Sequence, residues 1–265
     1  IDSGSMSTLN SYEEVALAEE LVSLHPWASS VRFARGGGEA MAIAIRIARA
    51  YTRKDVIAFC GYHGWHDWYL SANLTANSAL DGHLLPGLEP AGVPRELEGS
   101  IKPFYYGDTS SLRDIITAYG HTIAAIVLEP ARDSLPDKTF LSEVYELAAH
   151  NKSILIYDEV TSAFRINHGG IHLGLGVNPD IAIFAKGLGN GYPISAVIGN
   201  KAIMDAAQSS FISSTSWTER IGPVAALATL KKHRENNVSD HLIKIGKLTK
   251  GAWQNASLKS GINIT

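Results

Sequence analysis

The sequence predicts an α/β fold of three layers, in which a mainly parallel central sheet is flanked by helices. Its short apolar runs are bounded by turn residues, and helix-rich sequence separates most of them. Runs of this kind are typical of strands buried on both faces, as in parallel sheets. With 265 residues, 45% of them hydrophobic, the chain can bury a sizeable core.

The first elements expected along the chain are a helix, a strand and a second helix. Ser11-Tyr12-Glu13-Glu14 has the pattern of a capping box, so an amphipathic helix begins there and ends near His25-Pro26. A short strand at residues 31–34 leads into Gly36-Gly37-Gly38. A long helix rich in Ala and Ile follows at about residues 39–51.

Strands and helices then alternate over the rest of the chain. Residues 73–103 are rich in Gly, Pro and polar side chains and predict a long irregular excursion. Pro223 suits the first turn of the last helix in this part. Besides two strands described below, we expect strands at residues 56–60, 123–128 and 196–199, and helices at 112–119, 141–150, 203–208 and 224–230.

The domain organisation expected is one large α/β domain over residues 1–235, which opens with a Ser- and Gly-rich lead-in at residues 1–10. Residues 236–265 look helical at first and then fade into polar sequence. We expect them to be the start of a smaller C-terminal domain that this chain holds only in part.

Composition excludes several classes of function. Lys and Arg total 23, Asp and Glu total 26, and no basic block indicates a nucleic-acid partner. Cys60 is the single cysteine, so an intrachain disulfide is impossible and a reducing, cytoplasmic setting is expected. No uninterrupted apolar stretch approaches the length of a bilayer, so no membrane association is expected.

Two of the predicted strands end in a carboxylate and in an amine. Residues 154–160 contain Asp158 and Glu159 near their end, and residues 181–189 contain Lys186. Ligands of parallel sheets collect at the carboxyl ends of the strands. An aspartate and a lysine there could grip pyridoxal phosphate, which needs a Schiff-base lysine and an acidic partner for its ring nitrogen. Adjacent strand residues point to opposite sides, so only one of the two acids faces such a site.

Two loops add to this picture. Gly36-Gly37-Gly38 lies between a strand and a helix, where free N–H groups could bind an anion, although a tight turn without a ligand is as frequent. Tyr62 follows a strand directly and could stack on a planar ring, although core packing is the commoner role of an aromatic. His63 and His66 have a spacing that metals use, but no further ligands accompany them, so no metal site is expected.

The order and spacing of these motifs resemble the class III aminotransferases among the fold type I pyridoxal-phosphate enzymes. The resemblance is greatest to the glutamate-1-semialdehyde 2,1-aminomutase branch and spans roughly residues 10–248. Its most specific parts are Tyr62-His63-Gly64, residues 156–160, Phe164-Arg165, Asn178-Pro179-Asp180 and residues 185–193.

This resemblance implies a role for each matching residue in binding pyridoxal phosphate. Lys186 would hold the cofactor as a Schiff base, and Asp158 would pair with the ring nitrogen. Val160 would pack on one face of the ring and Tyr62 on the other. The rest of the expected cofactor-binding set comprises Gly37 and Gly38, whose backbone N–H groups would bind the phosphate, together with His63 and Glu129.

The resemblance also implies a homodimer with shared active sites. In the family, a threonine just before a proline-containing helix reaches the phosphate of the neighbouring subunit, and Thr218, five residues before Pro223, matches it. Two positions depart from the family pattern. Gly36-Gly37-Gly38 replaces the usual Ser-Gly-Thr, and Thr161 stands where Gln or Met is frequent.

The predicted function is amino-group transfer from a small-molecule amine donor to a carbonyl acceptor, with Lys186 as tether and then as general base. An intramolecular 2,1-aminomutase is the close alternative, because the chemistry at Lys186 would be identical. A non-catalytic remnant or scaffold, and a phosphate-ligand module that uses only the glycine loop, are further alternatives. Arg132 and Arg165 could bind a carboxylate or a phosphate.

Overall fold

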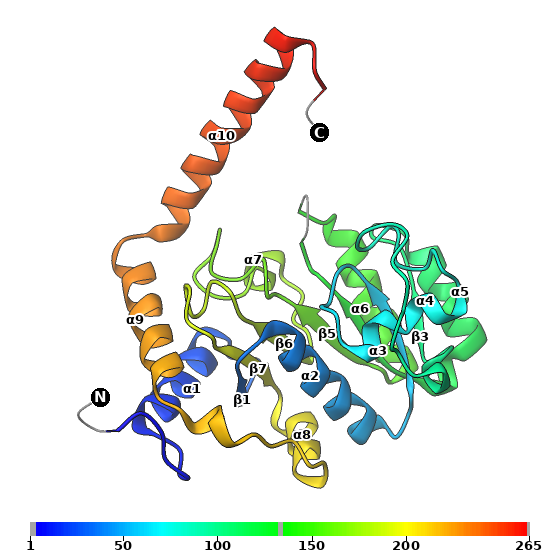
Figure 1. The fold of residues 1–265 in the computed structure, drawn as a ribbon, viewed down its shortest axis with the longest axis horizontal. Helices are drawn as coiled ribbons and strands as arrows, with labels where there is room; N and C mark the ends of the chain where they lie inside the picture. The colour runs from blue at the N-terminus through cyan, green and yellow to red at the C-terminus, as the bar shows by residue number, and fades with distance from the viewer. Residues whose placement is uncertain (1–3, 132–134, 264–265) are drawn as a thin grey trace.

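The computed structural model describes residues 4–131 and 135–263, and a sheet of seven strands forms its centre (Figure 1). The strands lie in the order β1-β7-β6-β5-β4-β2-β3. Their bounds are β1 (Ser30–Ala34), β2 (Val56–Cys60), β3 (Ile101–Pro103), β4 (Ile123–Leu128), β5 (Ile154–Asp158), β6 (Ile181–Phe184) and β7 (Ser195–Gly199).

Strand direction brings the loops of interest to one edge of the sheet. Strands β3, β2, β4, β5 and β6 are parallel, whereas β7 is antiparallel to both of its neighbours, β6 and β1. Strand β1 therefore points the same way as β6. The carboxyl ends of β1, β2, β4, β5 and β6 share one edge, and the prediction of a mainly parallel sheet is confirmed.

Helices cover both faces of the sheet, as predicted (Figure 1). One face packs against α2 (Gly37–Thr52), α3 (Asp67–Leu70), α4 (Ala72–Thr75) and α8 (Lys201–Met204). The other packs against α5 (Thr109–Tyr119) and α6 (Lys138–Asn151), and against α1 (Tyr12–Leu24) and α9 (Ile221–Glu235). Strand residues alternate between these faces. In β5, for example, Ile154 and Ile156 pack on the α2 side, and Leu155 and Tyr157 pack on the α6 side.

Helix α2 begins directly at the glycine loop and is held by small apolar side chains. Ala40, Ala44 and Ala48 recur at every fourth position and are completely buried, so the helix can approach the sheet closely. Ile43 and Ile47 fill the space beside them. Burying a side chain of this size stabilises a fold by roughly 1.5–3 kcal/mol.

The sequence predicted most of these elements, with differences at the ends and edges. Ser11 Oγ accepts the Glu14 N–H at 3.2 Å and caps α1 as expected. The excursion at residues 73–103 is not wholly irregular, because it contains β3 and a 3-10 turn at Arg95–Leu97. Strand β3 has three residues and ends in Pro103, which suits an edge strand that is too short to show a periodic pattern.

The polar tail differs most from its prediction. Helix α10 (Val238–Ser260) continues well into the sequence expected to fade, has no buried residue, and projects away from the sheet (Figure 1). A separate C-terminal domain beginning at residue 236 stays a prediction. Within residues 4–131 and 135–263, no helix combines the length and the apolar character that crossing a membrane requires.

His25 follows the last residue of α1 and joins this helix to the loop after β5. Its backbone N–H donates to Leu21 at 3.1 Å, and its ring Nδ1 donates to the same carbonyl at 2.7 Å. Ring Nε2 accepts the Gly170 N–H at 2.9 Å, so the neutral ring is fully hydrogen-bonded. The side chain is completely buried, and this burial lowers its pKa to about 4.

We expect His25 to make the fold sensitive to acid. Its pKa is lower in the folded chain than the ordinary value of 6.5, so its contribution to stability is complete above pH 6.5 and is lost as the pH falls towards 4. The loss amounts to about 3 kcal/mol in the free energy of unfolding. Urea unfolding measured across this range should show a shallower pH slope for His25→Asn, and equal slopes for both chains would contradict the expectation.

Candidate active site

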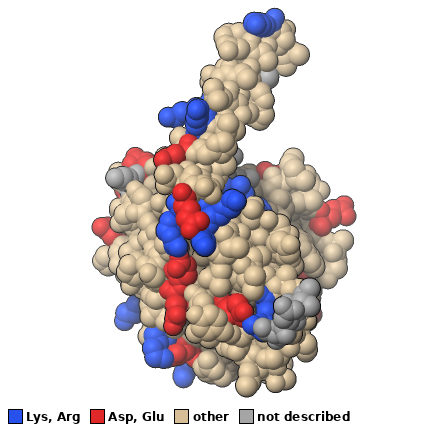
Figure 2. Space-filling model, turned by 90° about the vertical axis from the view of Figure 1, so that its left-hand side faces the viewer, with Lys and Arg blue, Asp and Glu red and all other residues tan. Residues whose placement is uncertain are grey.

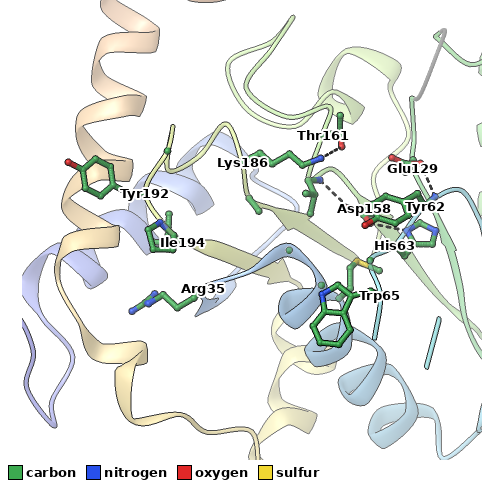
Figure 3. A pocket seen from close by; sticks show the side chains of 18 residues that line it. Arg35, Tyr62, His63, Trp65, Glu129, Asp158, Thr161, Lys186, Tyr192 and Ile194 are labelled. Atoms are coloured by element: carbon green, nitrogen blue, oxygen red, sulfur yellow. Dashed lines mark hydrogen bonds and ion pairs between the residues drawn. The ribbon is translucent and has the colours of Figure 1, made fainter. Parts of the chain in front are cut away.

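A cavity of about 410 Å³ opens at the edge of the sheet where the parallel strands end. Figure 3 shows side chains that reach it from the loops after β1, β2, β4, β5 and β6. It brings together most of the residues that the sequence singles out. They include Gly37, Gly38, Tyr62, His63, Glu129, Asp158, Val160 and Lys186, and Arg35, Trp65, Thr161 and Tyr192 join them.

Asp158 is the last residue of β5, and its carboxylate is held from two sides. Oδ1 accepts the Val160 N–H at 3.1 Å, and Oδ2 lies 2.9 Å from His63 Nδ1. The other ring nitrogen, His63 Nε2, lies 3.1 Å from the Cys60 carbonyl and must donate to it. Both His63 and Asp158 are at least 95% buried.

These hydrogen bonds limit the protonation of the His63 and Asp158 pair to two forms. Because both partners of the His63 ring are oxygens, a proton must also lie between Nδ1 and the Asp158 carboxylate. The pair therefore consists of an imidazolium beside a carboxylate, or of a neutral histidine beside a protonated aspartate. In either form His63 orients Asp158, and the sequence motif alone gives no indication of this contact.

Glu159 points to the opposite side of the strand, as predicted. It is completely buried, accepts the backbone N–H groups of Ile171 and His172, and bonds to His172 Nδ1. Trp27 Nε1 donates to His172 Nε2 at 2.8 Å, so the imidazole proton faces the carboxylate. This network anchors the end of β5 to α7 (His172–Leu175) and to Trp27 between α1 and β1, and it leaves the cavity to Asp158.

Lys186 stands just beyond β6 with its backbone in the left-handed region, at a φ of 39°. This conformation is uncommon for a residue with a side chain. Its Nζ donates to Thr161 Oγ1 at 2.9 Å, as Figure 3 shows. Thr161, one of the two departures from the family pattern, is thus the partner of the lysine amine, a role that sequence reasoning did not assign.

Tyr62, Glu129 and Val160 form the walls around Asp158. Glu129 Oε2 accepts the Tyr62 N–H at 3.0 Å, so the end of β4 holds the loop after β2. The Tyr62 ring is 38% exposed and meets Tyr69 edge-on, with 6.1 Å between the ring centroids. Val160 lies half-buried at the lip of the cavity, directly against Gly37.

The glycine loop is shaped by its neighbours. A Cβ on Gly38 would lie 2.7 Å from His66 Nδ1, and one on Gly37 would lie 3.0 Å from both methyl groups of Val160. A Cβ on Gly36 would meet nothing within 4 Å. The imidazole of His66 therefore occupies the space that a threonine would need at position 38, which explains why the chain has glycine there.

This set of groups fits pyridoxal phosphate. Lys186 offers an amine and Asp158 a buried carboxylate, and Gly37 and Gly38 bring the start of the sixteen-residue helix α2 to the cavity, where the first N–H groups of a helix can bind an anion. The bare glycine backbone leaves room for a phosphate to approach closely. In the part of the chain that the structure describes, no group of three or more His, Cys, Asp or Glu residues is placed to hold a metal ion.

Other predicted residues lie elsewhere. Thr218 lines a separate cavity, and its hydroxyl donates to the Ser7 carbonyl. Arg165 is exposed and donates to the Thr161 carbonyl at 3.4 Å, outside the main cavity. Arg132 falls outside the described residues. Their roles toward a neighbouring subunit or a substrate stay predictions.

Comparison with known proteins assigns this architecture to a family. The family model of the class III aminotransferases matches residues 3–261. A 3-aminobutyryl-CoA aminotransferase of Cloacimonas acidaminovorans (strain Evry) is 32% identical over 255 residues, covering 94% of this chain and 58% of the relative. A glutamate-1-semialdehyde 2,1-aminomutase of Methanobrevibacter smithii is also 32% identical, over 261 residues, covering 95% and 60%.

Two solved structures have the same fold. The FumI protein of Sphingopyxis sp. MTA144, in its PLP internal aldimine form, superposes with a TM-score of 0.85 at 27% identity, over 98% of this chain and 60% of its own. An omega-transaminase from Sphaerobacter thermophilus gives 0.78 at 28% identity, over 88% and 56%. The chain thus spans less than two thirds of the length of the proteins that it matches here.

The glycine loop generates a prediction at positions 36 and 38. Gly38→Thr should lower the free energy of unfolding by about 1–3 kcal/mol, because the new side chain collides with His66. Adding His66→Ala to that variant should recover most of the loss. Gly36→Ser places a hydroxyl in open space at the N-cap of α2 and should be neutral or slightly stabilising. Urea unfolding of the four chains tests this, and a Gly38→Thr chain as stable as the native one would contradict it.

Proposed function

Since this chain belongs to the class III aminotransferases, we propose that it transfers amino groups with pyridoxal phosphate held in the cavity described above. One observation carries the proposal. The Asp158 carboxylate and the Lys186 amine leave neighbouring parallel strands at the same edge of the sheet, and both line a cavity that begins at a glycine loop.

The residues of the cavity divide the binding of the cofactor among them. Lys186 would form the covalent link to the aldehyde carbon, and Asp158 would hold the ring nitrogen. The N–H groups of Gly37 and Gly38 would bind the phosphate, and Tyr62 and Val160 would enclose the ring. When bound, pyridoxal phosphate supplies an electron sink for the carbon that loses or gains the amino group.

Lys186 would then have two tasks. It first tethers the cofactor and, once an amine substrate has displaced it, carries a proton on Nζ between substrate positions as general base and acid. Thr161 Oγ1 accepts from Nζ in the described geometry and would give the released amine a fixed direction. Such orientation matters, because a proton transfer needs its donor and acceptor within hydrogen-bond reach.

Asp158 would be held in place by its two neighbours. The Val160 N–H and the His63 ring both bond to its carboxylate. An ionised Asp158 can in turn hold a proton on the ring nitrogen. The predicted roles of His63 and Glu129 are therefore indirect, because His63 orients the acid and Glu129 holds the backbone of Tyr62.

The proposed partners follow from the same chemistry. A small-molecule amine donor and a carbonyl acceptor are required, and a homodimer would bring Thr218 to the neighbouring phosphate. On the face shown in Figure 2, acidic and basic side chains are interspersed, which gives no support for a nucleic-acid partner. We propose a cytoplasmic location, in line with a single, buried cysteine.

A second candidate function is a 2,1-aminomutase, in which donor and acceptor carbons belong to one molecule. The 32% identity to an aminomutase over 95% of the chain favours it. Given an amine donor and a carbonyl acceptor, a transaminase should release a free keto product in step with amine consumption, whereas a mutase should isomerise one substrate and release none. Chromatography of reactions with and without an acceptor measures this difference, and isomerisation of a single substrate without keto product would replace our first proposal by the second.

Replacing Lys186 tests the central assignment. In the native chain, borohydride should fix pyridoxal phosphate to a peptide containing Lys186, which mass spectrometry locates. Lys186→Ala should show no such adduct and lose at least about 10²–10⁴-fold in turnover, the usual contribution of acid–base catalysis. Lys201→Ala, which removes an exposed lysine paired with Asp205, is the matched control.

Two results would argue against the proposal. A native chain that fails to bind added pyridoxal phosphate would overturn it, as would an adduct on another lysine. Cofactor binding without turnover over a broad panel of amines would instead favour a non-catalytic role.

A further inference from the structure

The glycine loop contacts a segment that lies far away in the sequence. This segment, residues 215–219, comprises a 3-10 turn (Thr215–Thr218) and Glu219, and leads into α9. It contains Thr218, the residue expected to serve the neighbouring subunit. Arg35 and Glu39, which flank the three glycines on either side, make the contacts.

Arg35 binds the segment through its guanidinium group. Its NH2 donates to the carbonyls of Ser216 and Trp217, each at 2.8 Å, and lies 3.1 Å from Glu219 Oε1. Figure 3 shows Arg35 directed away from Lys186. Both partners of the ion pair are only 19% exposed in their side chains, so water screens the pair weakly.

Glu39 makes the second connection, from the first turn of α2. Its Oε2 accepts the Arg35 backbone N–H at 2.8 Å and the Gly36 N–H at 3.4 Å. Its Oε1 accepts Trp217 Nε1 at 3.2 Å. One carboxylate thus joins the backbone at the start of the glycine loop to the residue beside Thr218.

We propose that Arg35 and Glu39 are positioning residues that join the glycine loop of one subunit to the segment that this subunit presents to its neighbour. The inference rests on the proposed function, because it requires a cofactor phosphate at the loop and Thr218 at the neighbouring phosphate. An anion bound at Gly37 and Gly38 then stabilises Thr218 in the position that the other site needs. The two cofactor sites of the dimer are coupled, each improving the affinity of the other.

The contacts of the segment support an effect of the glycine loop on the position of Thr218. Thr218 does not line the active-site cavity of its own chain, and its hydroxyl donates to the Ser7 carbonyl, so contacts within its own chain hold it in place. The charged groups beside the segment include Arg35, Glu39 and Glu219, and Glu14 of α1 lies near enough to Arg35 for the two charges to attract each other. Charge-assisted bonds that are largely shielded from water hold a defined geometry more firmly than exposed ones.

Mixed dimers test whether the connection acts across the subunit boundary. One subunit is native, and the other carries a tag and Lys186→Ala, so only the native subunit links the cofactor covalently. We titrate these dimers with pyridoxal phosphate and follow the absorbance of the lysine-linked cofactor. Adding Arg35→Gln to the tagged subunit should weaken binding at the native subunit about tenfold, the value of one lost bond to a charged group.

Two more variants of the tagged subunit sharpen the result. Trp217→Phe keeps an aromatic side chain but removes the indole N–H that donates to Glu39, and should weaken binding in the same direction by a smaller factor. Arg113→Gln removes an ion pair to Glu143 on α5 and α6, remote from the segment, and should change nothing. Gel filtration and unfolding curves establish that each dimer is folded.

Each outcome has one meaning. If Arg35→Gln and Trp217→Phe in the tagged subunit leave binding at the native subunit unchanged, the inference is wrong and the proposed function stands. If Thr218→Ala in the tagged subunit also leaves the native site unchanged, the shared active site is wrong too. If the native chain binds no pyridoxal phosphate, the proposed function fails, and the inference fails with it.

Discussion

The register between β5 and β6 is the constraint on which the rest of the site depends. Asp158 pairs with Ile183, and the Glu159 N–H donates to the Ile183 carbonyl at 3.0 Å. Side chains alternate along a strand, so a shift by one residue would turn Glu159 into the cavity and Asp158 toward α1. It would also displace Lys186 relative to Thr161. The geometry of the cavity is therefore a consequence of backbone pairing in the centre of the sheet.

The two buried acids at the end of β5, Asp158 and Glu159, allow only this register. Asp158 is served by His63 on the α2 side, and Glu159 by His172 on the other side. Leaving a carboxylate buried without donors costs far more than a hydrogen bond returns, so neither acid can take the place of the other. The adjacent pair keeps the strand end from slipping and leaves one of its members facing the cavity.

The sequence was sufficient for those features that leave a local pattern. Asp158 and Lys186 follow apolar runs of strand length, and the glycines mark the start of α2, so their common edge could be predicted. Strand β3 is too short to show a period, and α10 is regular despite its polar composition. The contacts of His63, His66, Thr161 and Arg35 could not be predicted, because each joins segments that only the folded sheet brings together. Arg35 and Glu219, for example, are separated by most of the chain.

The left-handed backbone at Lys186 has a consequence for how the chain can change. A φ of 39° strains a residue with a side chain by about 1–3 kcal/mol, whereas Gly, and to a lesser degree Asn, adopt such angles readily. Selection for thermal stability alone would thus favour replacing the one amine that the proposed chemistry cannot lose. Position 186 is a point of stability–activity trade-off, and a consensus-based or computational stabilisation of this chain should hold it fixed.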